Sequence, residues 1–159
     1  MKALPETAKD WAARLGLAFL VAAPVGNPDL FWHLTARARF LSEGRIPATE
    51  ISSFTLRGTP WTDFEWLFQL AVVAFERLGG FPALWAYKAL LWLALGVLVE
   101  ALGRLSGGAA RGRLLLALWC AASLGRADLK PELFSAAFFL ALLWSLEAFR
   151  RGRLAPPRP

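Results

Sequence analysis

The sequence predicts an all-α membrane protein with about four transmembrane helices and two amphipathic helices in the first external loop. Apolar residues make up 57% of the 159 residues and charged residues 19%, whereas soluble domains have about 45–50% and about 25%. Long uncharged stretches recur along the chain, and basic residues gather between them. The single cysteine, Cys120, excludes a disulfide scaffold and a cluster of metal-binding thiolates.

The first predicted span covers residues 15–27. Residues 1–14 are polar and mildly basic, and the stretch that follows them is apolar and carries no charge. A cleaved signal peptide has the same order of a basic start, a short apolar stretch and small residues, so this alternative stays open. As a span, the segment starts on the cytoplasmic side with Trp11 at the membrane edge.

Residues 27–81 are predicted to form one long external loop that holds two helices on the membrane surface. Between Pro28 and Gly44, apolar residues recur at steps of three and four, which is the pattern of an amphipathic helix. Residues 64–79 form a second, more apolar helix with charges at both ends. Helices of this kind lie in the interface with their apolar face toward the lipid.

Three further spans are predicted, at residues 82–103, 112–126 and 132–149. Basic clusters occur at the N-terminus and at residues 104–113 and 150–153, and short basic loops stay in the cytoplasm. The N-terminus is therefore expected in the cytoplasm, and residues 27–81 and 127–131 on the same outer face. In this topology residues 64–79 do not cross the membrane; if they do, the later basic clusters fall outside.

Residues 1–150 are thus predicted to form one polytopic membrane module, followed by a basic, proline-rich tail at residues 151–159. The formal net charge is +6, which in a soluble domain would indicate nucleic acid as a partner. Here the basic residues flank apolar stretches, so membrane lipid is the expected partner and nucleic acid is not.

Asp29, His33 and Arg37 follow one another at steps of four residues, so a helix would place them on one face. Such a stripe can accept a proton, hold a divalent metal ion through the carboxylate, or bind phosphate through the guanidinium, with Arg39 close by. The same spacing is also typical of a solvated helix face, and the spacing alone leaves both interpretations open. His33 is the only histidine and Cys120 lies in an apolar stretch, which argues against a zinc site.

Two further groups of charges border apolar stretches. Asp63 and Glu65 stand at the start of the second loop helix, where a carboxylate either caps the helix or serves a functional site. Glu132 stands at the outer end of the last predicted span. It belongs either to a plain turn or to a site on the same outer face as Asp29.

An ordered set of short motifs resembles the first external loop of a family of bacterial integral membrane proteins. The family pattern runs from Asp-Pro-Asp and His-Leu through Gly-x-Ile-Pro, Phe-Ser-x-Thr and Gly-x-x-Trp to Glu-Trp-Leu and a later Arg-Pro-Glu-Leu-Phe-Ser. The corresponding segments here are Asn27-Pro28-Asp29, Phe31-Trp32-His33-Leu34, Gly44-Arg45-Ile46-Pro47, Ser53-Phe54-Thr55, Gly58 to Trp61, Glu65-Trp66-Leu67 and Lys130-Pro131-Glu132-Leu133-Phe134-Ser135. The match covers roughly residues 10–153, and its specificity lies in the order of the motifs.

That family is similar to the GT-C superfamily of membrane glycosyltransferases, which use polyprenyl-phosphate-linked sugars, as protein O-mannosyltransferases and lipid A aminoarabinose transferases do. The resemblance implies that Asp29 is the catalytic base or the metal contact and that Glu132 is a second catalytic residue in the same cavity. It implies a substrate and phosphate site formed by His33, Arg37, Arg39 and Glu65. It also implies a polyprenyl-phosphate-linked sugar as donor and a multi-pass location in the bacterial cytoplasmic (inner) membrane, and it leaves open whether Asp29 holds a divalent metal ion as cofactor.

Two departures from the family pattern matter. Asn27 replaces the first acidic residue of the pattern, and an amide can coordinate or hydrogen-bond but cannot act as a base. The sequence also ends before the further spans of such transferases, so a fragment, one half of a split enzyme or an inactive relative is expected. The alternative function is a non-catalytic membrane subunit that binds lipid or a second membrane chain completing the fold. A transporter is disfavoured because the charges gather in one outer loop.

Overall fold

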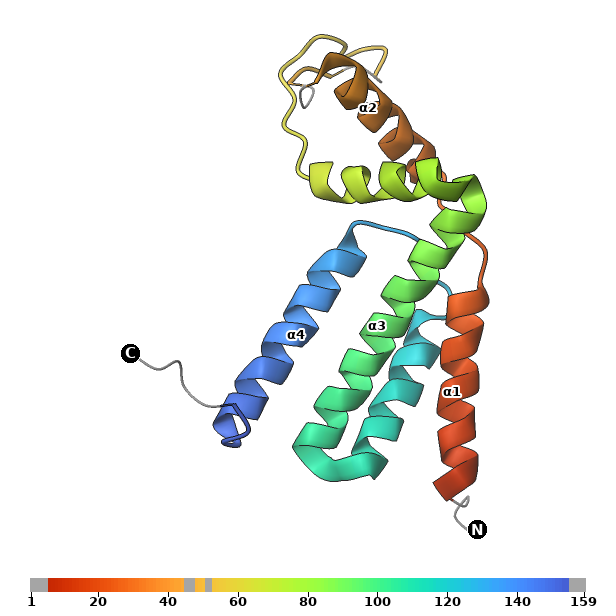
Figure 1. The fold of residues 1–159 in the computed structure, drawn as a ribbon, viewed down its shortest axis with the longest axis vertical. Helices are drawn as coiled ribbons and strands as arrows, with labels where there is room; N and C mark the ends of the chain where they lie inside the picture. Colours follow the sequence, from red (N-terminus) through yellow and green to blue (C-terminus); the bar gives the residue numbers. More distant parts are fainter. Residues whose placement is uncertain (1–5, 45–47, 51–52, 155–159) are drawn as a thin grey trace. The chain divides into compact units, whose positions relative to one another are not determined.

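The computed structural model describes residues 6–44, 48–50 and 53–154, with the side chains of residues 6–12 and 37–40 outside the described part. Four helices follow one another along the chain (Figure 1): α1 Glu6–Ala22, α2 Asp29–Glu43, α3 Trp66–Ser123 and α4 Glu132–Arg150. The β-type pairing within the described ranges is a single antiparallel bridge between Thr49 and Pro60. The prediction of an all-α chain is therefore confirmed.

Two of these helices, α3 and α4, are long and apolar enough to cross a membrane, a property that core helices of soluble proteins also have. The apolar part of α1, Ala13–Ala22, is shorter than a span. The bounds of α4 agree with the predicted span at 132–149. By contrast, α1 begins well before the predicted start at residue 15, because the polar first turns continue into the apolar stretch without a break. The four-span topology stays a prediction.

Helix α3 joins three segments that the sequence predicts as separate helices. It has 58 residues, and a straight α-helix of that length would extend about 85 Å, nearly three times the thickness of a bilayer core. The helix is not straight, because Gly80 and Gly108 have positive φ angles of 63° and 82°. Figure 1 shows the chain changing direction at both places. Glycine adopts this left-handed conformation without the clash that a Cβ would cause.

The chain divides into two compact units. We call them the helical unit, which is the described part of Met1–Pro24, Lys88–Asp128 and Glu132–Pro159, and the loop unit, which is the described part of Val25–Tyr87 and Leu129–Pro131. The helical unit therefore holds α1, most of α3 and α4. The loop unit holds α2, the segment that leads to α3, and the first turns of α3.

Small residues bring the backbones of the helical unit together. A Cβ on Gly103 would lie 2.7 Å from the Cα of Gly112, so the two arms of α3 touch backbone to backbone beside the turn at Gly108. A Cβ on Gly96 would lie 2.7 Å from Cδ1 of Leu17, which places α1 tightly against the first arm. Close contact through glycine is typical of helix packing in membranes, where water supplies no hydrophobic driving force.

The loop unit has a core of its own. Leu30 of α2, Val72 and Leu84 of α3, and Leu129 are almost completely buried. Phe75 and Tyr87 stack with ring centroids 4.2 Å apart and an interplanar angle of 11°. The predicted amphipathic character of α2 holds for Leu30, but Phe31 on the same helix is 60% exposed.

Candidate functional site

The start of α2 carries the first motif of the resemblance, and its geometry is that of a helix cap. The Asn27 side-chain Oδ1 accepts a hydrogen bond of 3.2 Å from the backbone N–H of Asp29. Pro28 occupies the first helical position, where the missing N–H of proline costs nothing. Asn27 is therefore the N-cap, one of the residue types that best satisfies the free N–H groups of a first turn. This cap presents the side chain of Asp29 at the exposed end of the helix.

Asn27 makes a second contact with a segment far along the chain. Its Nδ2 donates a hydrogen bond of 3.2 Å to the backbone carbonyl of Leu129, 102 residues away. The Asn27 side chain is buried, so both its acceptor and its donor are in use within the loop unit. An aspartate could supply the acceptor but not the donor. The departure of Asn27 from the family pattern therefore has a structural reason.

His33 lies one turn further along α2 and is buried, with 3% of its surface exposed. Its ring meets the rings of Trp32 and Phe68 edge to face, with centroids 4.9 and 5.0 Å apart. Its Nδ1 lies 3.6 Å from Oε2 of Glu65, whose side chain is 44% exposed. The imidazole is thus fixed by aromatic rings on two sides, and Glu65 connects it to the surface of the loop unit.

Asp63 caps the start of α3. Its Oδ1 accepts hydrogen bonds from the backbone N–H of Glu65 at 3.0 Å and from Nε2 of Gln69 at 3.1 Å. Gln69 is buried, so this carboxylate satisfies an amide that would otherwise lack an acceptor in the core. Of the two interpretations that the sequence left open for Asp63, the structure supports the cap.

The predicted polar stripe on α2 is only partly assembled. Asp29 is exposed, whereas His33 points into the core and meets Glu65. Arg37 and Arg39 belong to α2, but their side chains lie outside the described residues. The structure thus brings His33 and Glu65 together, two residues that the resemblance assigns to one substrate site, and the role of the two arginines stays a prediction.

Glu132 lies in the first turn of α4, and its side chain is exposed. This residue belongs to the helical unit, while Asp29 belongs to the loop unit. A shared cavity for the two carboxylates therefore stays a prediction.

A divalent metal ion at Asp29 stays an open prediction. Within the described residues, no group of three or more His, Cys, Asp or Glu side chains is placed to hold a metal ion. The chemistry proposed below uses Asp29 as a proton acceptor.

One functional candidate was not singled out from the sequence. Lys88 is fully buried in α3, within the helical unit, and its Nζ donates to the backbone carbonyl of Ala23 just past the end of α1. The Asp128 carboxylate adds a favourable electrostatic interaction with the ammonium group. A cation beside the negative end of a helix dipole is stabilised there. The sequence feature that could have identified it is a lysine inside a long apolar stretch. Ionisable residues in such stretches are typical of functional or structural sites in membranes.

Comparisons with protein-family models, with curated proteins and with solved structures found no match. The resemblance described above therefore depends on the motifs of the sequence alone.

Proposed function

We propose that the chain is a GT-C-like membrane protein whose loop unit binds a polyprenyl-phosphate-linked sugar on the external face of the bacterial inner membrane and transfers the sugar to an acceptor hydroxyl. The proposed topology has four spans and a cytoplasmic N-terminus. Activity is proposed for the full chain in the membrane, with a second membrane chain as its proposed partner.

One observation carries the proposal: motifs that are far apart in the sequence meet in the loop unit. Asn27 at the start of α2 is bonded to Leu129, beside the Lys130-Pro131 motif. Trp32 of the His-Leu motif lies edge to face against Trp61 of the Gly-x-x-Trp motif, with centroids 6.0 Å apart. His33 meets Glu65 of the Glu-Trp-Leu motif. A set of motifs with a common site is expected to converge in this way.

Exposed apolar side chains support an interfacial position for the loop unit. They lie in the segment that leads into α3 and in the first turn of α3, and they are Phe54, Leu56, Trp61, Phe64, Trp66 and Leu67. Phe54 is 99% exposed and Phe64 is 87% exposed, an arrangement that water disfavours and lipid headgroups accommodate. Tryptophan in particular is enriched at membrane–water interfaces.

The proposed chemistry uses Asp29 as general base. The carboxylate takes the proton of the acceptor hydroxyl as the acceptor oxygen bonds to the anomeric carbon of the sugar. The bond between that carbon and the phosphate oxygen breaks, and the polyprenyl phosphate leaves with the electron pair. Arg37 and Arg39 are proposed to stabilise the negative charge on the departing phosphate, since guanidinium groups match phosphate oxygens in pairs.

The test uses membranes that contain the full chain together with the products of neighbouring genes. Transfer of radiolabelled sugar from polyprenyl-phosphate donors is measured beside photocrosslinking to a benzophenone-bearing polyprenyl phosphate. Asp29→Asn is expected to abolish transfer while leaving crosslinking unchanged. Asp63→Asn is the matched control, because Asp63 is a helix cap that uses only acceptor contacts. Undiminished transfer by the Asp29 variant would refute the assignment.

The topology has its own test. Cysteine replaces Arg77 or Arg111, both exposed, in a chain whose native Cys120 has been changed to Ala. A membrane-impermeant thiol reagent is expected to label position 77 from outside and position 111 only after the cytoplasmic side is opened. Labelling of position 77 from the cytoplasm alone would overturn the four-span topology.

A second candidate is a non-catalytic subunit that binds lipid phosphate or a partner chain. The observation that favours it is the burial of His33, which removes the imidazole from the polar stripe. For this function, the Asp29→Asn variant crosslinks to polyprenyl phosphate as the unmodified chain does, and neither of them transfers sugar.

A further inference from the structure

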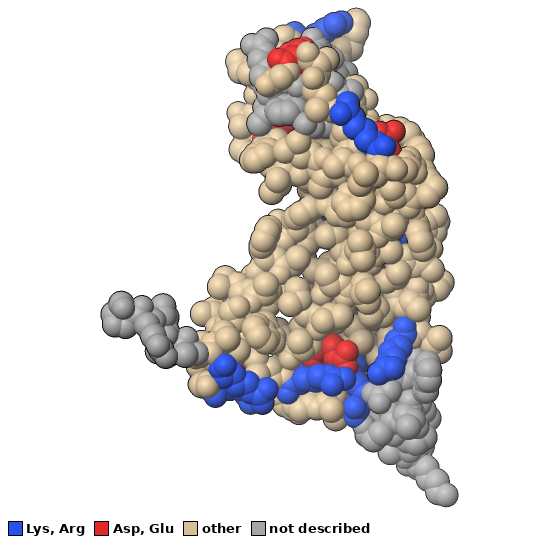
Figure 2. Space-filling view, viewed as in Figure 1, with Lys and Arg blue, Asp and Glu red and all other residues tan. Residues whose placement is uncertain are grey.

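Arginine side chains gather at one end of the helical unit. They flank the turn of α3 at Gly108 or lie in the last turn of α4 and just after it, and they are Arg104, Arg111, Arg113, Arg150, Arg151 and Arg153. Figure 2 shows blue side chains along this edge of the molecule, with few red ones among them. Within this group Arg104 pairs with Glu100, and Arg150 and Arg151 both pair with Glu147. The six guanidinium groups outnumber the two carboxylates that pair with Arg104, Arg150 and Arg151.

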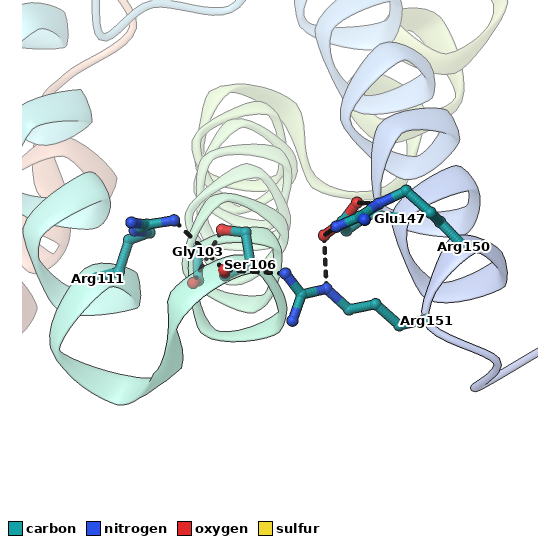
Figure 3. A network of polar contacts seen from close by, with 6 residues as sticks. All are labelled: Gly103, Ser106, Arg111, Glu147, Arg150 and Arg151. Atoms are coloured by element: carbon teal, nitrogen blue, oxygen red, sulfur yellow. Dashed lines mark hydrogen bonds and ion pairs between the residues drawn. The ribbon is translucent and has the colours of Figure 1, made fainter.

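Two of these arginines converge on one acceptor. The backbone carbonyl of Ser106 accepts a hydrogen bond from Nη2 of Arg151 at 2.9 Å and another from Nη1 of Arg111 at 3.3 Å (Figure 3). Arg151 follows the last residue of α4 directly, and Arg111 belongs to the second arm of α3. The carbonyl oxygen orients both guanidinium groups, and Glu147 pairs with that of Arg151 but not with that of Arg111. A carbonyl carries only a partial negative charge, so the charge of Arg111 is available to an anion beside this acceptor.

The turn is built to hold one of the two cations in place. A Cβ on Gly107 would lie 2.6 Å from Cζ of Arg111, so only glycine leaves room for the guanidinium to lie over the turn. Gly108, with a φ of 82°, lets the two arms of α3 fold back on each other. Gly107 therefore gives the Arg111 guanidinium room over the turn, where its hydrogen bond to the Ser106 carbonyl orients it.

Apolar side chains border this basic end. Leu114 follows Arg111 by less than one turn and is 57% exposed, and on α4 Leu146 and Phe149 are 56% and 54% exposed. A soluble phosphate ion would bind the arginine side chains and leave the apolar side chains in water. A phospholipid would use both, with its headgroup on the guanidinium groups and its acyl chains along the leucine and phenylalanine side chains.

We propose that the basic end of the helical unit is a binding site for the phosphate headgroup of an anionic phospholipid, with Arg111 and Arg151 as its paired ligands. The site is separate from the loop unit and does not depend on the proposed transfer reaction. The Arg111 guanidinium contributes N–H donors to phosphate oxygens, and Arg151 contributes the N–H groups that its bonds to Glu147 and Ser106 leave over. The excess of arginine at this end attracts the anionic headgroup from the surrounding membrane.

The experiment measures lipid binding to the full chain in detergent micelles by native mass spectrometry, with cardiolipin and phosphatidylcholine as probes. The unmodified chain is expected to retain cardiolipin in preference to phosphatidylcholine. The double variant Arg111→Gln with Arg151→Gln is expected to lose about thirtyfold in cardiolipin affinity. The matched control, Arg57→Gln with Arg126→Gln, removes the same charge from exposed positions elsewhere and is expected to change the affinity less than about threefold.

A second variant separates the site from general charge and from folding. Gly107→Ala keeps every charge and displaces the Arg111 guanidinium, so it is expected to weaken cardiolipin binding about fivefold. Three results would overturn the proposal: equal retention of the two lipids, an equal loss in the control pair, or displacement of cardiolipin by millimolar inorganic phosphate, which would indicate a site for free anions.

Discussion

Replacement of Asn27 by Asp changes one hydrogen-bond donor into an acceptor and leaves the shape of the side chain almost unchanged. The Oδ1 atom that caps α2 is retained, and Asp caps a helix as well as Asn does. The Nδ2 atom, which lies 3.2 Å from the carbonyl oxygen of Leu129, becomes a carboxylate oxygen. Two oxygens then face each other at a position that is buried in the loop unit.

The magnitude follows from three contributions. Loss of the buried hydrogen bond costs about 1 kcal/mol, and an unpaired buried acceptor costs about 1–3 kcal/mol. The negative charge near the start of α2 interacts favourably with the helix dipole, which stabilises the folded loop unit by about 0.5 kcal/mol. We therefore expect Asn27→Asp to destabilise the loop unit by about 2 kcal/mol, which corresponds to about a thirtyfold change in the opening equilibrium.

Hydrogen exchange of the full chain in detergent micelles measures this opening directly. The amides of α2 are expected to exchange about thirtyfold faster in Asn27→Asp than in the unmodified chain. The control is Asp63→Asn, the reverse exchange at the other cap. Both contacts of Asp63 use Oδ1 as acceptor, and an amide oxygen supplies the same acceptor, so its cost is expected below about 0.5 kcal/mol.

Two outcomes would refute this reasoning. Unchanged protection of α2 in Asn27→Asp would mean that the bond to Leu129 contributes nothing to the loop unit. An equal cost in Asp63→Asn would mean that any change of charge at a cap has this effect, whether or not a donor is needed there.

Three further predictions concern the helical unit, and thermal unfolding followed by tryptophan fluorescence in detergent checks each of them. Gly96→Val is expected to cost about 1–3 kcal/mol because its Cβ meets Leu17 at 2.7 Å, and Leu17→Ala in the same chain should recover most of this loss. Gly103→Ala directs a methyl group at backbone and is expected to cost about 3 kcal/mol, whereas Gly125→Ala meets no atom within 4 Å and should change stability by less than about 0.5 kcal/mol. Lys88→Met fills the same buried volume but leaves the carbonyl past the end of α1 without its donor, so a loss of about 1–3 kcal/mol is expected; an unchanged midpoint would contradict it.

Local features of the fold could be predicted from the sequence because neighbouring residues determine them. The last helix begins at Glu132, directly after Pro131, and its bounds agree with the end of the predicted span. Asn27 and Pro28 form an N-cap and first helical position, the order that helix starts prefer. The turn between the predicted spans at 82–103 and 112–126 lies at a glycine. Gly108 has the left-handed conformation that only glycine adopts easily.

The environment of His33 could not be predicted in this way. A period of four residues places it on a stripe with Asp29, and the stripe is a property of α2 alone. Burial depends on what packs against the helix, and here Phe68 and Glu65 arrive from α3 and the segment before it. Periodicity identifies a face of a helix but not the partner of that face, so the imidazole was expected at the surface and lies in the core.

The long-range contacts share a further reason why the sequence conceals them. Lys88 donates to the carbonyl of Ala23 and Trp92 donates to the carbonyl of Asp128, both in the helical unit, while Asn27 of the loop unit donates to another backbone carbonyl. In each case a polar side chain satisfies the backbone where a helix has ended, and every residue type offers the same carbonyl. The acceptor therefore cannot be recognised in the sequence. The donor can be recognised, because it is a polar residue in or beside an apolar stretch. A donor of this kind is better interpreted as a tie to backbone than as a catalytic group until a side-chain partner is found for it. By that criterion Asp29, exposed at a capped helix end, remains the stronger candidate for chemistry than Asn27 or Lys88.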